Sequence, residues 1–264
     1  MSVTSPVQRR ESAILDGSGE GRPLVEAQNL QKKFRSYHAV RGVSFTCYSG
    51  EVFGLLGPNG AGKTTTIRML TTILRPTSGT ARIAGYDVVR EPEEVRRAIG
   101  VLPENAGVYG RLTGREAIRY AGRLYGLVGR DLERRIVEIA DALELTPHLD
   151  RLSDTYSKGM KQKVNVARAL IHNPRVVFLD EPTSGLDVIS ARSVRDFVLR
   201  FKAEGRCVIL STHMMEEAER LCDRVAIIAG GRIRAEGELE QLKADTGQDL
   251  EEIFMAMVEQ SIVR

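Results

Sequence analysis

The stretch Glu51-Val-Phe-Gly-Leu-Leu-Gly57-Pro-Asn-Gly-Ala-Gly-Lys63-Thr64 decides the fold of this chain. It begins as a compact apolar run, typical of a buried strand, and passes directly into a glycine-rich loop. The loop matches the pattern G-x-x-x-x-G-K-[ST], and helical spacing of apolar residues follows it over Lys63–Leu74. A strand, this loop and a helix in that order predict a binding site for a nucleoside triphosphate.

The residue types in the loop follow from the chemistry of a phosphate group. Glycines allow consecutive backbone N–H groups to turn inward around phosphate oxygens, and the helix N-terminus adds the positive end of its dipole. Lys63 is expected to reach the β- and γ-phosphates, and the Thr64 hydroxyl is expected to ligate Mg²⁺. The expected nucleotide-binding loop comprises Gly57, Pro58, Asn59, Gly60, Ala61, Gly62, Lys63, Thr64 and Thr65.

Polar residues follow two apolar strands later in the chain. The run Val176–Leu179 stops at Asp180-Glu181, and the strand expected over Cys207–Thr212 stops at His213. The carboxyl ends of parallel strands form the sheet edge at which phosphate loops also lie. Asp180 is therefore expected to hold Mg²⁺ through a water, and Glu181 to orient or deprotonate the attacking water. His213 could donate a hydrogen bond to the γ-phosphate.

The rest of the sequence indicates an α/β protein. Leu24–Glu51 is predicted to form short strands and turns, Thr80–Val89 a hairpin, and later strands alternate with helices as in a mostly parallel sheet. The expected P-loop NTPase core therefore carries an N-terminal antiparallel β part and an inserted helical subdomain. The expected ranges are a flexible tail at 1–22, an ATP-binding domain at 23–236 with the helical insertion at about 92–155, and C-terminal helices at 237–264.

Composition excludes several other classes of protein. The 264 residues are 42% hydrophobic and 28% charged, as in globular proteins, and no apolar run is long enough to span a bilayer. A net charge of +3, the absence of Trp and an aromatic content of 5% do not indicate a nucleic-acid partner. Three unpaired Cys are expected to be small buried residues in a reducing cytosol.

The ordered set of motifs resembles the ATP-binding subunit of ABC transporters, over about residues 24–264. The set runs from the phosphate loop through Ser157-Lys-Gly159-Met-Lys-Gln and Asp180-Glu181 to Ser184-Gly-Leu-Asp187 and His213. Tyr156-Ser157-Lys158-Gly159-Met160 stands where the family has its L-S-G-G-Q signature. Lys158 and Met160 depart from that signature, whereas Ser157 and Gly159 match it.

The resemblance implies roles for several further residues. Ser157 and Gly159 would bind the γ-phosphate of ATP held by the opposite subunit. Phe34 stands at the position of the aromatic residue that stacks on adenine, and Asp187 lies in a loop that signals between the two sites. Glu104 stands where the family has a Gln ligand of Mg²⁺, and its carboxylate adds negative charge beside a triphosphate.

A finer resemblance is to the ATPases of ABC-2-type exporters, which include sodium-extrusion and drug-efflux systems. The segments that carry it are Leu102–Glu116, Tyr156–Lys163 and Leu250–Phe254. It implies a motor subunit that binds and hydrolyses ATP with Mg²⁺ at the cytoplasmic face of the cell membrane, as a peripheral protein. The expected partners are transmembrane permease subunits and a second ATP-binding subunit in an ATP-dependent homodimer.

Two alternatives lie in other functional classes. One is a soluble ABC ATPase acting in translation or DNA repair, although such proteins usually carry two cassettes or a long coiled coil, which this chain lacks. The other is a small-molecule kinase with a phosphate loop, which would need an acceptor site and would leave the signature segment and His213 without a role. A phosphorylated product would identify such a kinase.

Overall fold

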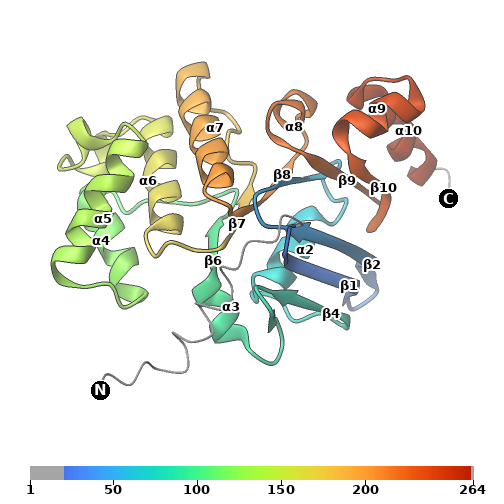
Figure 1. The fold of residues 1–264 in the computed structure, drawn as a ribbon, viewed down its shortest axis with the longest axis horizontal. Helices are drawn as coiled ribbons and strands as arrows, with labels where there is room; N and C mark the ends of the chain where they lie inside the picture. Colours follow the sequence, from blue (N-terminus) through green and yellow to red (C-terminus); the bar gives the residue numbers. More distant parts are fainter. Residues whose placement is uncertain (1–20, 263–264) are drawn as a thin grey trace.

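The computed structural model describes residues 21–262 (Figure 1). In chain order its strands and helices are β1 (Pro23–Phe34), β2 (Tyr37–Tyr48), β3 (Val52–Leu56), α2 (Lys63–Leu70), β4 (Ser78–Ile83), β5 (Tyr86–Asp87), α3 (Pro92–Ala98), β6 (Ile99–Leu102), α4 (Gly114–Leu124), α5 (Gly129–Ala142), two 3₁₀ turns at Thr146–His148 and Ser153–Thr155, α6 (Lys158–Leu170), β7 (Val176–Asp180), α7 (Val188–Ala203), β8 (Cys207–Thr212), α8 (Met215–Leu221), β9 (Arg224–Ala229), β10 (Arg232–Glu238), α9 (Leu239–Thr246) and α10 (Leu250–Ile262).

Two sheets organise the molecule, and the predicted α/β class is confirmed. The larger sheet has the order β10-β9-β3-β8-β7-β6, in which all neighbours are parallel except β10 beside β9. The smaller sheet has the antiparallel order β2-β1-β4-β5. Every residue of β3, β7 and β8 is buried, because both faces of the larger sheet are covered.

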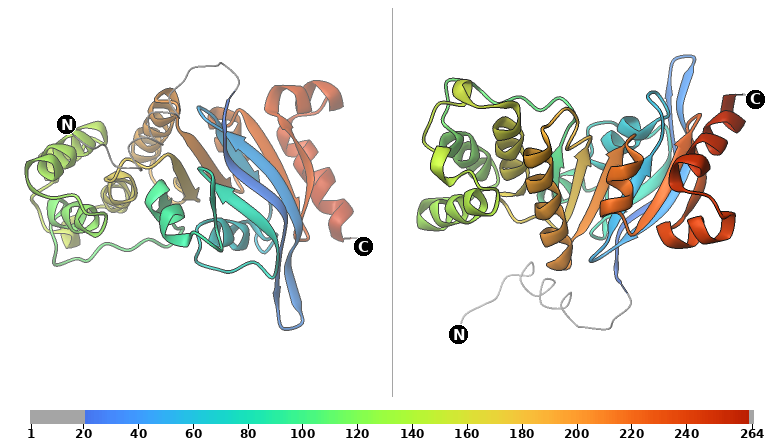
Figure 2. Two further views of the ribbon diagram at one scale, coloured as in Figure 1. Left: turned by 60° about the horizontal axis from the view of Figure 1, so that its bottom comes forward. Right: turned by 90° about the horizontal axis from the view of Figure 1, so that it is seen from above.

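Alternation along each central strand divides the core between the two faces of the larger sheet. In β7, Val177 and Leu179 pack among residues of the helices, whereas Val176 and Phe178 pack with the antiparallel sheet and α2. A period of two along the strand produces this division. Helices α4, α5 and α6 form one end of the molecule, and α9 and α10 lie at the other end (Figures 1 and 2).

The N-terminal β part differs from the sequence prediction of short strands. β1 and β2 each contain 12 residues and form one long hairpin, which extends beyond the neighbouring strands in Figure 2. Four register shifts interrupt the pairing of β1 with β2. Gly42, which suggested a break in the sequence, has φ +93° within β2. The strand continues through it with a local irregularity.

Two other elements differ from the sequence prediction. Helix α2 ends at Leu70 instead of Leu74, and Thr72 adopts a left-handed φ of +64° just beyond it. Strand β10 has no counterpart in the prediction, because its sequence is polar except for isolated apolar residues. As the edge strand of the sheet it has no buried residue and pairs only with β9.

The expected domain ranges correspond only in part to the observed elements. The range 92–155, expected to be a helical insertion, contains β6, which pairs with β7 in the core sheet. The helical region therefore begins after Leu102 and continues through α6. Residues 1–20 of the expected tail lie outside the described residues. Of its last two residues, Arg22 accepts a hydrogen bond at its carbonyl from the Ser49 N–H at 3.1 Å.

The three cysteines Cys47, Cys207 and Cys222 are free, and all three are buried, as predicted. Between residues 21 and 262, no helix is both long enough and apolar enough to cross a bilayer.

Candidate functional site

The phosphate loop connects β3 to α2 and leaves the first turn of the helix free to bind an anion. Gly62 occupies the N-cap position with φ +111°, provides no side-chain cap, and is followed by no acidic residue in the first turn. The first N–H groups of a helix lack partners within the helix, and they carry the positive end of its dipole. This terminus is therefore suited to bind phosphate.

The outer glycines of the loop are required by close packing as well as by phosphate. A Cβ atom at Gly57 would lie 2.4 Å from the Ile228 carbonyl oxygen of β9. At Gly62 it would lie 2.8 Å from the Ala39 carbonyl oxygen of β2. The loop is thus held between strands of both sheets. A side chain at either glycine would push the loop away from the backbone of β9 or β2.

Lys63 lies under the loop, with 6% of its surface exposed. Its ammonium donates hydrogen bonds to the carbonyl oxygens of Gly57 at 2.6 Å and Pro58 at 3.3 Å. Burial lowers the pKa of Lys63, and the negative charges of Glu181, Asp180 and Glu104 oppose that shift. Those acidic groups thus lie near the phosphate loop. The fold brings Asp180 and Glu181 close to Lys63 although they are more than 100 positions away in the chain.

The carboxylate pair lies where β7 ends, beside the neighbouring end of β8. Asp180 is 4% exposed, and its Oδ1 is buried without a hydrogen-bond partner. Glu181 is 8% exposed and adopts a left-handed φ of +52°, and its N–H donates to the Ser211 carbonyl at 2.9 Å. A non-glycine residue in this conformation costs roughly 1 kcal/mol and turns the chain sharply out of the strand.

His213 contacts Glu181 directly, which sequence analysis did not predict. Its Nδ1 lies 2.8 Å from Oε1 of Glu181, with the ring N–H donating to the carboxylate. The other Glu181 oxygen, Oε2, is buried without a partner. The imidazole side chain is half exposed and also lines the pocket described next, so it connects the carboxylate with the solvent side of the site.

One pocket brings most of the expected residues together. Its lining residues are Tyr37, Ala39, Pro58, Asn59, Gly60, Ala61, Gly62, Lys63, Thr64, Thr65, Glu104, Asp180, Glu181, Ser184 and His213. Tyr37, Ala39 and Ser184 were not singled out from the sequence. Ala39 shows no chemical signal in a sequence, whereas Ser184 lies within the quoted Ser184–Asp187 segment and could have been found there.

The aromatic residue expected at the adenine is not among those lining this pocket. Phe34 lies at the end of β1 with 42% of its surface exposed, and the Lys32 ammonium lies 5.1 Å from its ring centroid. Tyr37, three residues further along the hairpin, lines the pocket and places its hydroxyl 3.5 Å from the Gly60 carbonyl oxygen. Both aromatic residues lie at the tip of one hairpin, so their spacing in the sequence does not show which of them lines the pocket.

The signature segment and Asp187 do not line the pocket of their own chain. Ser157 caps α6 by accepting a hydrogen bond from the Met160 N–H at 3.2 Å, and Asp187 caps α7 by accepting one from the Ser190 N–H at 2.9 Å. A Cβ atom at Gly159 would lie 2.0 Å from Oγ of Ser190. The starts of α6 and α7 are therefore packed against each other.

The oxygen ligands in the pocket fit a magnesium ion that is also bound by phosphate oxygens. The unpartnered Asp180 oxygen and the Thr64 hydroxyl are hard oxygen ligands in one pocket. Within residues 21–262, no group of three or more His, Cys, Asp or Glu is arranged to hold a metal by itself. Mg²⁺ is typically held by one or two carboxylates together with substrate phosphates, which matches this arrangement.

Comparison with known proteins agrees with the fold and the site. A family model described as ABC transporter matches residues 40–184. The ATP-binding protein NatA of Bacillus subtilis is 41% identical over 89% of this chain and 97% of its own length. The daunorubicin/doxorubicin resistance ATP-binding protein DrrA of Streptomyces peucetius is 43% identical over 86% of this chain and 68% of its own length.

A solved ATP-binding subunit of an ABC transporter superposes with a TM-score of 0.81, at 33% identity over 89% of this chain and 99% of that one. The matched region includes the phosphate loop and the carboxylate pair, which the pocket brings together. The chain therefore belongs to the ABC transporter family, as an ATP-binding subunit with ATPase activity.

Proposed function

We propose that this chain is the motor subunit of an ABC exporter, which binds ATP with Mg²⁺ and drives separate transmembrane subunits. The observation that carries the proposal is the single pocket in which Lys63 of the phosphate loop meets Asp180 and Glu181. Export is supported by the names of the similar proteins, one of which is a drug-resistance ATP-binding protein. The membrane subunits would bring the protein to the cytoplasmic face of the membrane.

The charged residues of the pocket have roles that their positions support. Lys63 and the N–H groups of the loop bind the phosphates. Thr64 and Asp180 would hold Mg²⁺, which would supply positive charge to neutralise the phosphate oxygens. Glu181 takes the proton of the attacking water, and His213 orients the Glu181 carboxylate. Glu104 is exposed and lines the same pocket, so its carboxylate would add negative charge beside the triphosphate.

The adenine is assigned to the tip of the β1–β2 hairpin, which carries Phe34 and Tyr37. An aromatic face there can stack on a base. The γ-phosphate is assigned a second set of ligands from another chain, Ser157 and Gly159 at the start of α6, with Asp187 beside them. This assignment is supported by the position of α6, whose N-terminus lies outside the pocket of its own chain.

The enzymatic proposal is tested with Glu181→Gln and Lys63→Ala. Glu181→Gln removes the group that takes the proton and leaves the loop intact, so ATP affinity should change by less than about threefold while turnover falls by about 100-fold or more. Lys63→Ala should weaken ATP binding itself. Phosphate release and fluorescent-nucleotide titration measure the two quantities, and wild-type turnover by Glu181→Gln would refute the role of Glu181.

The transport proposal is tested by purifying tagged Glu181→Gln from native membranes in the presence of ATP. We expect a protein with several membrane spans to co-purify in a fixed ratio to the tagged chain. The Lys63→Ala variant, treated in the same way, controls for nucleotide-independent adsorption. Co-purification of ribosomes or DNA-associated proteins instead would support the soluble ATPase.

A further inference from the structure

A buried carboxyl group lies near Glu181 without lining the pocket. Glu217, in the first turn of α8, is 3% exposed. In the described part of the chain it forms no ion pair within 4.0 Å. Glu181, by contrast, contacts His213 and interacts electrostatically with Lys63. Burying an unpaired carboxylate is unfavourable, so a Glu at this position needs an explanation that packing alone does not provide.

Glu217 accepts a hydrogen bond from Thr183, in the turn that follows Glu181, and the Thr212 hydroxyl at the end of β8 also acts on its carboxyl group. The Thr183 hydroxyl donates to Oε1 of Glu217, and Oε2 of Glu217 is buried without a partner. Thr183 is itself 7% exposed, so water does not compete for its hydroxyl. The bond joins residues that are 34 positions apart and connects α8 with the end of β7.

The turn that carries Thr183 is held from the opposite side as well. The Gln162 side-chain amide, from α6, donates to the Pro182 carbonyl at 2.8 Å. Within the turn, the Ser184 N–H donates to the Glu181 carbonyl at 3.3 Å. Glu181, at the start of the turn, is in the left-handed conformation, which persists only where surrounding contacts hold it.

Helix α8 begins two residues after His213, so Glu217 is linked by a short rigid segment to the partner of Glu181. The Met214 N–H donates to the Thr212 hydroxyl at 3.1 Å, and the Ala218 N–H donates to the Met214 carbonyl, which fixes this segment. The Glu217–Thr183 bond therefore closes a ring that runs through Glu181, His213 and α8. A ring of this kind fixes the position of Glu181 relative to His213, the residue that orients its carboxylate.

We propose that Glu217 is a positioning residue for hydrolysis, which holds the Glu181–Ser184 turn through Thr183 and so directs the Glu181 carboxylate at the attacking water. The proposal rests on the proposed role of Glu181. Burial raises the pKa of Glu217, hydrogen bonds from Thr183 and Thr212 lower it, and the negative charge of Glu181 raises it again.

The experiment compares paired variants at the two ends of this bond. Glu217→Ala and Thr183→Val each remove the bond, and each should lower kcat by about tenfold or more, because small displacements of a reacting group are costly. The KM for ATP and the equilibrium affinity for ATP should change by less than about twofold, since the phosphate loop is untouched. The double variant should be no slower than the slower single variant.

Conservative substitutions separate positioning from packing. Glu217→Gln keeps the acceptor oxygen and Thr183→Ser keeps the hydroxyl, so both should retain kcat within about threefold. Glu216→Ala, at the adjacent and 84% exposed side chain of α8, is the matched control and should behave as wild type. Thermal unfolding of every variant shows whether it is folded at the assay temperature.

The proposal is overturned if Glu217→Ala or Thr183→Val retains wild-type kcat, if kcat losses multiply in the double variant, or if ATP affinity falls in parallel with kcat. Should Glu217→Ala not fold, Thr183→Val and Thr183→Ser decide the question alone. Failure of the proposed function looks different. Wild-type turnover by Glu181→Gln would refute hydrolysis at Glu181, whatever the Glu217 variants do.

Discussion

At the scale of single residues, several glycines are explained by contacts inside this chain. Gly159 stands in the signature segment, where sequence reasoning assigned it to the close approach of phosphate. In the structure it also faces the start of α7, because a Cβ atom there would lie 2.0 Å from Oγ and 2.6 Å from Cβ of Ser190. The Ser190 hydroxyl is held by Asp187 at 2.7 Å, so it cannot easily turn away.

This contact predicts the sign of a stability change. In an open helix, replacing Gly by Ala stabilises by about 1 kcal/mol, whereas Gly159→Ala should lower the free energy of unfolding by about 1–3 kcal/mol through overpacking. Urea unfolding measures the change. Ser190→Gly removes both clashing atoms, so the double variant should recover at least part of the loss, and strictly additive effects would contradict this explanation.

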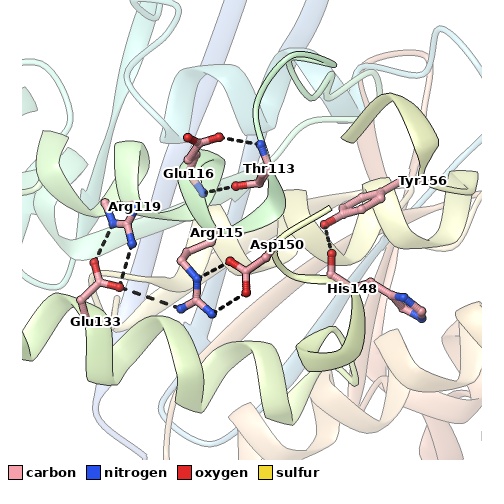
Figure 3. A network of polar contacts seen from close by, with 8 residues as sticks. All are labelled: Thr113, Arg115, Glu116, Arg119, Glu133, His148, Asp150 and Tyr156. Atoms are coloured by element: carbon pink, nitrogen blue, oxygen red, sulfur yellow. Dashed lines mark hydrogen bonds and ion pairs between the residues drawn. The ribbon is translucent and has the colours of Figure 1, made fainter. Parts of the chain in front are cut away.

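At the scale of elements, the helical region is held by a polar network as well as an apolar core (Figure 3). Arg115 of α4 donates to Asp150 at 2.6 and 3.0 Å, and Arg119 donates to Glu133 of α5 at 2.6 and 2.9 Å. The hydroxyl of Tyr156, the first residue of the signature segment, donates to the His148 carbonyl at 2.6 Å. These bonds connect α4, α5 and the loop that leads to α6.

Packing should contribute more than the ion pairs to the stability of this region. Asp150 is 69% exposed, so Asp150→Ala should cost less than about 1 kcal/mol, whereas Ile136→Ala at a fully buried position of α5 should cost about 2–5 kcal/mol. The matched control is Val137→Ala, at a 47% exposed neighbour in the same helix. Urea unfolding compares the three variants, and equal losses for Asp150→Ala and Ile136→Ala would contradict this ranking.

At the scale of the whole molecule, the two proposed sets of phosphate ligands are separated within one chain. Lys63 lies in the pocket, whereas Ser157 begins α6 outside it. The proposed function therefore requires two chains that each complete the other's site. ATP should convert the Glu181→Gln protein from a monomer of 29.2 kDa to a dimer of twice that mass, and ADP should not.

Ser157 provides the test of this arrangement by sedimentation velocity. Ser157→Arg places a large side chain at the expected interface and should abolish the ATP-dependent dimer in the Glu181→Gln background, with monomer affinity for ATP unchanged. Ser157→Asp keeps an N-cap residue for α6 while adding a charge that repels phosphate, so it should have the same effect without loss of the cap. Dimerisation by both variants would refute the shared site.

The sequence by itself determined the parts of this protein that are encoded over short distances. The apolar run, the loop and the helix around Lys63 are contiguous, and the strands ending at Asp180 and Thr212 follow from local patterns of apolar residues. The parallel arrangement followed from the alternation of strands and helices. Sequence and structure agree here because each feature depends on neighbours within about ten residues.

The tertiary structure alone decided the features that depend on contacts between distant segments. Strand β10 is polar and is a strand only because β9 offers a free edge. The contact between Glu217 and Thr183 likewise needs α8 to dock against the end of β7. Such contacts depend on chain closure and on packing of the complete core, so no local pattern of residues specifies them.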